Sequence, residues 1–332
     1  MPVDVFNEQN CLTGGTLYLI VPCFNEEAAL PHSAPVLRQQ LQVLKDNNGV
    51  ALSSRVLFVN DGSTDGTWEA IKALHSEAPD VFSGLNLSCN RGHQNALLAG
   101  LMAVKDIADV TITIDADLQD DIAVMGDMIE LFNQGVDVVY GVRSRRKKDS
   151  FFKRFTARSF YRAMRLLGAD VVFDHADYRL MSKRALLGLA KFEEVNLFLR
   201  GLVPLVGYSH AMVAYERAER VAGETKYPLR KMLAFALEGV TSLSTKPLRL
   251  ISLLGVAVFI VSIVASVYVL MQFLAGKTVP GWASTTLSTW GIGGLMIFSL
   301  GVVGEYIGKI YMETKARPRY LIESFLNDRD DS

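Results

Sequence analysis

The amino-acid sequence predicts an α/β domain with a mainly parallel, Rossmann-like sheet, followed by two C-terminal transmembrane helices. Between Thr16 and Val142, short β-branched runs alternate with helical stretches, which is the pattern of parallel strands joined by crossover helices. Near the C-terminus, two long stretches carry no charged residue. Because 50% of its 332 residues are hydrophobic, the chain can fill one globular core and still supply apolar sequence to a membrane.

The elements of the predicted domain follow from this alternation. Strands are expected at Leu17–Val21, Val56–Asn60, Gly84–Leu87, Val110–Ile114 and Val136–Tyr140. Helices are expected at Ala34–Asp46, Thr67–Ser76, Gln94–Ile107 and Val124–Asn133. Short polar motifs follow the strand ends, and in open α/β sheets this carboxyl edge is where ligands bind.

The two uncharged stretches run from Leu250 to Gly276 and from Thr278 to Gly304. Each is longer than the ~20 residues that a helix needs to cross the hydrocarbon of a bilayer. Buried core helices are the alternative, but these are usually shorter and have a polar face. Basic residues flank the pair at its outer ends, and the loop between the stretches has only Lys277. Since such residues stay on the cytoplasmic side, we expect a multi-pass protein of the inner (cytoplasmic) membrane, with the globular domain and both termini in the cytoplasm.

The charge distribution limits the classes of molecule that the chain is expected to bind. The formal net charge of −1 argues against a general nucleic-acid-binding protein, and the three cysteines have no metal-type or redox-type spacing. The segment from Arg143 to Arg165 is nevertheless strongly basic. Within it, apolar residues alternate with arginines over residues 151–167, which predicts a helix lying in the lipid headgroups. An ordinary surface helix is the alternative. A second amphipathic helix is expected at about residues 229–243.

Two carboxylates separated by one residue follow the strand expected at Val110–Ile114. Because successive strand residues point to opposite faces, Asp115 and Asp117 are expected on the same side. Their oxygens suit a divalent cation, and Mg²⁺ or Mn²⁺ on a diphosphate would neutralise the leaving group. A solvated turn is the alternative, since Asp-x-Asp often occurs by chance.

A second polar motif extends from Asn60 to Thr67. Asp61 stands at a strand end, Gly62 allows a tight turn, and the residues after it can cap the next helix. A capped turn between a strand and a helix is enough to explain why these residues occur here, and the same residues could also bind a ligand. Together with the segment from Ile20 to Glu27, the motif predicts a polar pocket wide enough for a nucleoside.

Five motifs occur in a specific order: Val-Pro-Cys-Phe-Asn-Glu-Glu (21–27), Asn-Asp-Gly-Ser-Thr-Asp-Gly-Thr (60–67), Asn-Arg-Gly-His-Gln-Asn (90–95), Asp-Ala-Asp-Leu-Gln-Asp (115–120) and Arg-Val-Ala-Gly-Glu-Thr-Lys (220–226). This ordered set, which covers most of the chain, resembles the family 2 inverting glycosyltransferases with the glycosyltransferase A fold. With the paired spans and Gly-Glu-Tyr-Ile-Gly at 304–308, the chain resembles their polyprenyl-phosphate hexosyltransferase branch, which is related to dolichyl-phosphate mannose synthase and bactoprenol glucosyltransferase.

The resemblance implies a domain organisation. Residues 1–227 would form a cytoplasmic glycosyltransferase domain that includes the interface helix at 151–167. Residues 228–247 would form a juxtamembrane amphipathic helix, and residues 248–310 two transmembrane helices with a short external loop. Residues 311–332 would be a cytoplasmic tail.

The resemblance also implies roles at matching positions. Asp61 would face the base, Asp177 would lie beside the sugar, and Arg220 and Lys226 would belong to a mobile loop over the diphosphate. The donor-binding residues would be Pro22, Asn25, Glu26, Asp61, Arg91, Asp115 and Lys226. The catalytic residues would be Asp117, Asp177, Arg143 and Arg220, and the metal ligands Asp117 and Gln119. The acceptor phosphate would meet Arg154, Arg158, Ser159 and Arg179. A purely structural ion pair between Asp177 and Arg179 is the alternative for those two residues.

The expected reaction is transfer of a hexose, glucose by family frequency, from a UDP-sugar to undecaprenyl or another polyprenyl phosphate, for modification of a cell-envelope glycan. A lipid phosphate is already anionic at neutral pH, so no strong general base is required. The site must instead supply positive charge that lets two anions approach. Attack of the phosphate oxygen on the anomeric carbon would invert its configuration.

Two other functions compete with this one. A processive polysaccharide synthase shares the aspartates, but it carries a Gln-x-x-Arg-Trp motif and more spans, and this sequence has neither. A non-catalytic membrane scaffold that binds nucleotides would be favoured by loss of Asp117 or Gln119, and both are present. The expected partners are therefore the donor, the lipid acceptor and the bilayer, with no nucleic acid. The transmembrane helices could also associate into a homo-oligomer.

Overall fold

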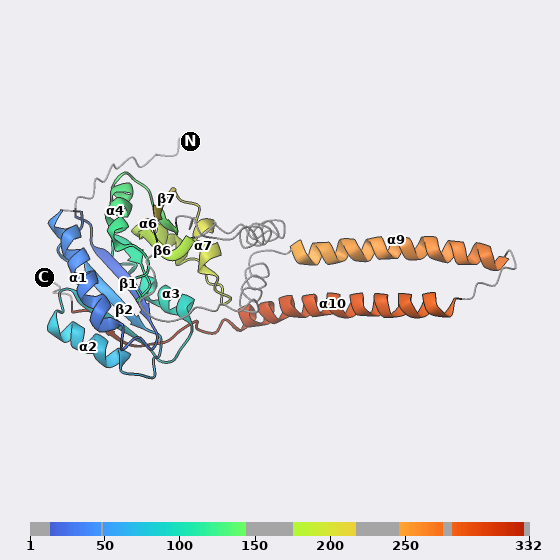
Figure 1. Cartoon of the computed structure of the whole chain (residues 1–332), viewed down its shortest axis with the longest axis horizontal. Helices are drawn as coiled ribbons and strands as arrows, with labels where there is room; N and C mark the ends of the chain where they lie inside the picture. Colours follow the sequence, from blue (N-terminus) through green and yellow to red (C-terminus); the bar gives the residue numbers. More distant parts are fainter. Residues whose placement is uncertain (1–13, 48, 144–174, 217–245, 275–280, 329–332) are drawn as a thin grey trace. The chain divides into compact units, whose positions relative to one another are not determined.

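A computed structural model of the chain describes residues 14–47, 49–143, 175–216, 246–274 and 281–328. These residues belong to two units. The first is a sheet domain, which also includes the C-terminal segment from Pro318 onward. The second contains two long helices, α9 and α10 (Figure 1). The amphipathic helices expected at residues 151–167 and 229–243 lie outside the described residues.

An eight-stranded sheet forms the first unit, with the strand order β7-β5-β6-β4-β1-β2-β3-β8. β1 to β5 and β7 point the same way, whereas β6 and β8 run antiparallel to their neighbours. The strands are β1 (Leu17–Cys23), β2 (Arg55–Asn60), β3 (Phe82–Leu87), β4 (Val110–Thr113), β5 (Val138–Arg143), β6 (His175–Ser182), β7 (His210–Tyr215) and β8 (Ile322–Leu326). The prediction of a mainly parallel α/β sheet is confirmed.

The helices of this unit begin close to the predicted positions. The largest difference is at α1, which begins at Leu30 instead of Ala34. Pro31 falls in its first turn, where a missing N–H costs little because that group has no partner inside the helix. The helices are α1 (Leu30–Asp46), α2 (Thr67–Glu77), α3 (His93–Val104), α4 (Met125–Asn133), α6 (Lys183–Leu189) and α7 (Leu199–Leu205), with a 3₁₀ turn, η1, at Ile122–Val124.

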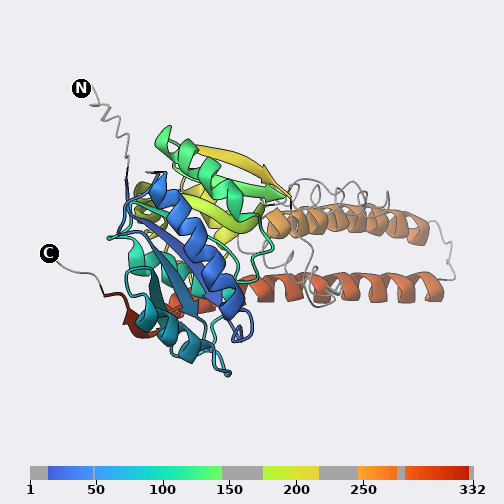
Figure 2. The same ribbon diagram turned by 60° about the vertical axis from the view of Figure 1, so that its left-hand side comes forward.

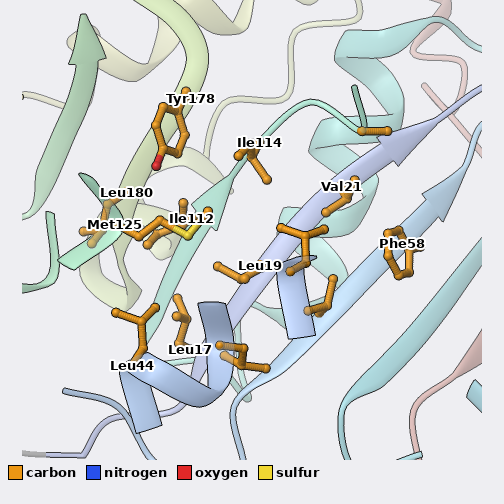
Figure 3. Packing of buried hydrophobic residues seen from close by; sticks show 14 of the residues in the cluster. Leu17, Leu19, Val21, Leu44, Phe58, Ile112, Ile114, Met125, Tyr178 and Leu180 are labelled. Carbon is orange, nitrogen blue, oxygen red and sulfur yellow. The ribbon is translucent and has the colours of Figure 1, made fainter. Parts of the chain in front are cut away.

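Helices cover both faces of the sheet (Figures 1 and 2). Alternate residues of β1 separate the two layers, as expected for side chains that point to opposite faces. Leu17, Leu19 and Val21 pack in one core with α1, α2 and α4 (Figure 3). Tyr18 and Ile20 pack in a second core with α3, α6 and α7. Because β1 is buried along its whole length, the loop that follows it starts from a rigid base.

Three strands and two short helices were not expected from the sequence. β6 and β7 extend the sheet beyond β5, and α6 and α7 lie between them in the chain. β8 lies in residues 311–332, where the sequence predicts a cytoplasmic tail. The structure instead pairs β8 with β3 at the edge of the sheet, so part of that segment belongs to the sheet domain.

In the second unit, α9 (Lys246–Leu274) and α10 (Trp282–Lys315) run side by side (Figures 1 and 2). Among the described residues, one helical segment, Gly291–Lys315, is long and apolar enough to cross a membrane. Its exposed side chains include Met296, Ile297 and Leu300, which suits a lipid environment. The sequence prediction of a span here is supported by length and composition, and the second span stays a prediction.

Candidate active site

The strand order reverses direction next to β1. From β1 the chain proceeds to β2 and β3 on one side, and it then crosses to β4 on the other side of β1. Loops that leave β1 and β4 therefore start from the carboxyl edge at the point where the strand order reverses, which is where ligands bind in open α/β sheets. Asn25 and Glu26 follow β1, and Asp115 and Asp117 follow β4. The topology thus brings together the motifs that sequence analysis identified.

The loops after β1 and β2 are bound to each other by hydrogen bonds. Asn25 has a left-handed backbone, with φ of 56°, and its N–H donates to Ser63 Oγ (2.9 Å). Asn25 Oδ1 accepts from the N–H of Thr64 (2.9 Å), and Glu26 donates its N–H to Thr67 Oγ1 (2.8 Å). The predicted donor residues Asn25 and Glu26 are therefore held in place, and Pro22 is buried in β1 beneath them.

Asp61 holds the next loop. It is 2% exposed, and its two carboxylate oxygens accept the N–H groups of Arg91 (2.7 Å) and Gly92 (2.9 Å). Burial raises the pKa of Asp61, although these two hydrogen bonds oppose the shift. A carboxylate has about four acceptor positions, so two positions on Asp61 stay unused, and a ligand would reach them only if this buried carboxylate became exposed. The predicted contact with a base stays a prediction, and the observed contacts assign Asp61 a structural role as well.

Gly62, beside Asp61, is required by the close approach of two loops. Its φ is +60°, and a Cβ at this position would lie 2.4 Å from the backbone nitrogen of Asn90. We predict that Gly62→Ala displaces the loop of residues 89–92, since a shift of this size breaks the two hydrogen bonds to Asp61. If this loop binds the nucleotide that the sequence analysis predicts, the variant should bind it about tenfold more weakly. Isothermal titration with UDP measures the effect.

The matched control for Gly62→Ala is Gly135→Ala. Gly135 also has a positive φ, +93°, but a Cβ there would meet nothing within 4 Å. This variant carries the backbone strain without the clash, so it should lose stability and keep nucleotide affinity. Equal affinities in the two variants would contradict the account of the Gly62 contact.

The two carboxylates after β4 lie in a turn. β4 ends at Thr113, and Leu118 has a left-handed backbone, with φ of 46°. The strand alternation used in the sequence analysis therefore does not place Asp115 and Asp117, and the two differ in environment, Asp115 being half-buried and Asp117 exposed. Asp117 Oδ1 accepts the N–H of Gln119 at 3.2 Å, so the two predicted metal ligands are adjacent.

Negative charge accumulates at this edge. Burial raises the pKa of Glu26, and the nearby carboxylates of Asp117, Asp65 and Asp115 raise it further. Burial also raises the pKa of Asp115, with Asp177 among the groups that add to the shift. The described residues contain no cluster of three or more His, Cys, Asp or Glu side chains suited to a metal ion. Carboxylate and amide oxygens are nevertheless ligands that Mg²⁺ and Mn²⁺ accept. Asp117 is exposed and fits a cation that takes its other ligands from a diphosphate and water, whereas Gln119 is 6% exposed and would have to turn outward to join it.

Asp177 lies opposite Asp115 at the same edge, because β6 runs antiparallel to β4 and begins where β4 ends. Its carboxylate accepts hydrogen bonds from Arg179 Nη2 (2.7 Å) and from Arg200 Nε and Nη2 (3.2 and 3.0 Å). His93 Nε2 is 3.4 Å from Asp177 Oδ2 and 3.7 Å from Asp115 Oδ1. Burial alone would raise the pKa of Asp177, but His93, Arg179 and Arg200 outweigh it and hold that pKa well below its usual value.

Arg179 is 1% exposed, and this burial changes its expected role. Two of its guanidinium nitrogens, Nε and Nη1, have no hydrogen-bond partner among the described residues, so Asp177 is the group that compensates its charge. A direct contact with an acceptor phosphate would require the guanidinium to become exposed. The structural ion pair, which the sequence left open as the alternative, is observed.

Arg143, at the end of β5, is tied to the loop after β4. Its Nη2 donates to Asp120 Oδ1 (3.2 Å), and its Nε donates to the hydroxyl of Tyr215 (3.2 Å). Tyr215 in turn donates to the same Asp120 oxygen (2.6 Å). Arg143 remains a third exposed, so it can still reach a phosphate while one side of its guanidinium is fixed.

Sequence reasoning missed four residues of this site. His93 has no role assigned from the sequence, although this residue lies in the motif at 90–95 and begins a helix directly after Gly92. Asp120 was visible in the motif at 115–120 without an assigned role. Arg200 and Tyr215 reach the site through α7 and β7, whose positions no local pattern indicates. The predicted residues Arg154, Arg158, Ser159, Arg220 and Lys226 lie outside the described residues, and the side chain of Arg91 is exposed next to the site.

A mainly parallel sheet with acidic residues at the switch point next to β1 agrees with the glycosyltransferase A fold that the sequence predicts. The profile described as Glycosyl transferase family 2 matches residues 18–188, and that described as GtrB C-terminal hairpin matches residues 246–310. The chain belongs to glycosyl transferase family 2, and the predicted resemblance is confirmed.

Relatives align over nearly the whole chain. An uncharacterized glycosyltransferase of Bacillus subtilis, YkoT, is 49% identical over 92% of this chain and 91% of the relative. The bactoprenol glucosyl transferase of Shigella phage SfX is 39% identical over 92% of this chain and 98% of the relative. Among solved structures, glucosyl-3-phosphoglycerate synthase from Mycobacterium tuberculosis, in complex with Mn²⁺, UDP-glucose and phosphoglyceric acid, is similar with 19% identity and a TM-score of 0.42, covering 74% of this chain and 85% of that one.

Proposed function

We propose that this glycosyltransferase moves glucose from UDP-glucose to a polyprenyl phosphate, undecaprenyl phosphate in particular, and releases UDP. The observation that carries the proposal is the 38–39% identity, over 92% of the chain, to enzymes named bactoprenol glucosyl transferase. The alignment includes the C-terminal hairpin region as well as the catalytic domain. Because these relatives align with both the catalytic domain and the hairpin region of this chain, we propose that this chain uses the same class of acceptor.

The electrostatics of Asp177 support a phosphate acceptor. A sugar hydroxyl must lose its proton during attack, which requires a general base whose pKa is near the working pH. Asp177 is a poor candidate for this base, because one histidine and two arginines hold its pKa well below the usual value. A phosphate oxygen is already ionised and needs no such base. Asp177 therefore suits a phosphate acceptor better than the hydroxyl acceptor of a processive synthase, whereas Asp115 and Glu26, whose pKa values burial raises, do not discriminate between the two acceptors.

Each group of loops at the carboxyl edge has a role in the proposed reaction. The loops after β1 and β2, with Asn25, Glu26 and Asp61, would bind the nucleoside, and Asp115 would lie near the ribose and diphosphate. Arg143 would contact a phosphate with the exposed part of its guanidinium. Asp117 and Gln119 would hold the divalent cation, which when bound would offset the charge of the departing diphosphate. Asp177, fixed by Arg179 and Arg200, would orient the sugar or the acceptor, and attack opposite the leaving group would invert the anomeric carbon.

The pairing of β8 supports a two-span anchor. β8 follows α10 in the chain, yet it belongs to the same sheet as the strands that precede α9. If Gly291–Lys315 crosses the bilayer, the chain must cross a second time before it, since both ends return to one domain. Among the described helices, α9 with 29 residues is long enough for that crossing. Basic residues at both outer ends favour the cytoplasmic side for the domain.

The test incubates the purified full-length protein with undecaprenyl phosphate, Mn²⁺ and a panel of radiolabelled nucleotide sugars. Label from UDP-glucose is expected in the organic phase, with UDP as the second product. Label in a product too polar to extract would indicate a processive synthase. Binding of UDP-glucose without any product would indicate a nucleotide-binding scaffold and would contradict the proposal.

A further inference from the structure

β8 pairs with β3, and one end of this strand pair lies on the same edge of the sheet as the loops after β1 and β2. The two strands are antiparallel, with Leu87 opposite Ile322 and Gly84 opposite Leu326. The beginning of β8 therefore lies at the carboxyl end of β3, on the ligand-binding edge of the sheet, and the end of β8 lies near the opposite edge. A polar side chain near each end of β8 accepts a hydrogen bond from another strand of the sheet. These residues are Glu323 near the first end and Asn327 just after the second.

Glu323 begins a chain of side-chain hydrogen bonds across two strands. Its Oε2 accepts from Asn86 Nδ2 (2.8 Å), and Asn86 Oδ1 accepts from Asn60 Nδ2 (2.7 Å). Asn60 Oδ1 then accepts the N–H of Ser63 (3.3 Å). Asn86 and Asn60 are 8% and 2% exposed, so water cannot easily replace the bond between them, whereas Glu323 at the start of the relay is exposed. The relay leads from the C-terminal strand to the loop after β2.

The carboxylate fixes the direction of the relay. An ionised carboxylate only accepts hydrogen bonds, so Asn86 must turn its amide nitrogen toward Glu323 and its oxygen toward Asn60. Asn60 then presents its own nitrogen to Asn86 and keeps its oxygen for the Ser63 N–H. Without the charge at Glu323, the buried amides could adopt the reversed orientation, in which an Asn60 N–H group would face the Ser63 N–H.

The far end of the relay is the proposed donor site. Ser63 Oγ accepts the N–H of Asn25 (2.9 Å), and Asn60 is followed by Asp61, whose carboxylate holds the backbone at Arg91 and Gly92. A rotation of the Asn60 amide would therefore disturb the loops that carry both Asn25 and Asp61.

We infer that Glu323 is a positioning residue for the nucleotide donor: the strand that follows the hairpin completes the donor site by orienting Asn86 and Asn60. The inference rests on the proposed function, because it takes the donor to be a uridine nucleotide. Glu323 itself touches no part of the reacting sugar or phosphate. Its expected effect is on donor binding, and the chemical step should change little.

The experiment measures UDP binding in the presence of Mn²⁺ by isothermal titration on the full-length protein in detergent, together with the KM for the donor. Glu323→Ala should raise the Kd for UDP about tenfold, as expected for loss of a hydrogen bond to a charged group, and should raise KM more than it lowers kcat. Glu323→Gln keeps an acceptor oxygen but also carries an NH₂ donor, so it permits both orientations of Asn86 and should restore only part of the affinity. Asn86→Ser breaks the same relay one residue further along and should match Glu323→Ala.

Asn327→Ala is the matched control on the same segment. Asn327 Oδ1 accepts from Tyr18 Oη (3.1 Å) and Ser83 Oγ (2.9 Å), at the starts of β1 and β3 and away from the ligand-binding edge. This variant should lower the Tm and leave the Kd for UDP unchanged. An unchanged Kd in Glu323→Ala, or an equal loss of affinity in Asn327→Ala, would overturn the inference. Wild-type protein that does not bind UDP would instead contradict the proposed donor and, with it, this inference.

Discussion

Replacing Asp117 with Asn is expected to reduce sugar transfer by about a thousandfold or more, because the charge stabilisation that a divalent cation gives a departing diphosphate is worth several kcal/mol. Asp117 is exposed and has one observed partner within the described residues, the N–H of Gln119. An amide oxygen can accept that same hydrogen bond. The variant should therefore keep the turn after β4 and lose cation affinity.

The measurement combines product formation with a direct readout of the cation. Mn²⁺ titrated into wild-type protein with UDP should give a bound paramagnetic signal, and Asp117→Asn should require much more Mn²⁺ to reach it. Asp121→Asn is the control, since Asp121 is a neighbouring exposed carboxylate that caps the 3₁₀ turn through Ala123 N–H (2.9 Å), and asparagine caps equally well. Normal turnover of Asp117→Asn, or full wild-type activity in EDTA, would refute the metal assignment.

The parts of the fold that the sequence predicted are those that local patterns specify. The buried runs of β1, β2 and β4 and the helices between them have clear periodicity, and each predicted strand from β1 to β5 is present. The motifs at the strand ends lie together because parallel strands present the same edge. Local pattern was therefore enough to predict that the loops after β1 and β2 lie together at this edge, and their contact with a nucleoside stays a prediction.

The remainder depends on long-range pairing that no local pattern encodes. β6 enters the sheet between β4 and β5 in the antiparallel direction, and this direction alone brings Asp177 next to Asp115. β8 pairs with β3 across more than 200 positions of the sequence. A short exposed edge strand after two apolar helices has the composition of a tail, so the sequence predicts a tail there. The connection between Glu323 and the donor site became visible only with the register of that pair.

Asp177→Ala should be the most destabilising single substitution in the site. It removes the carboxylate that compensates Arg179, whose side chain is 1% exposed, and it leaves Arg200 without two of its hydrogen bonds. Removing one partner of a buried ion pair typically costs about 3–5 kcal/mol, because the other charge stays buried and uncompensated. Thermal unfolding of the full-length protein in detergent should show a large fall in Tm.

Acidification supplies an independent check on this charge cluster. The pKa of Asp177 is depressed in the folded protein, whereas an unfolded chain has an ordinary value of about 3.9. Its stabilising contribution is then fully present above that unfolded value and is lost as the pH falls toward the folded pKa. The difference in stability between wild type and Asp177→Ala should therefore shrink in acid. It should also decrease as the pH rises above neutrality, because Asp177 raises the pKa of His93 and the stability from the protonated pair is lost when His93 deprotonates.

Asp106→Ala is the control for the Asp177 experiment. Asp106 pairs with Lys105 at the surface, where the carboxylate is 70% exposed, and exposed ion pairs contribute little because water and salt screen them. Its removal should leave both Tm and the acid profile nearly unchanged. If Asp177→Ala behaved in the same way, burial of Arg179 would not depend on Asp177, and the rigid orientation proposed for this carboxylate beside the sugar would lose its physical basis.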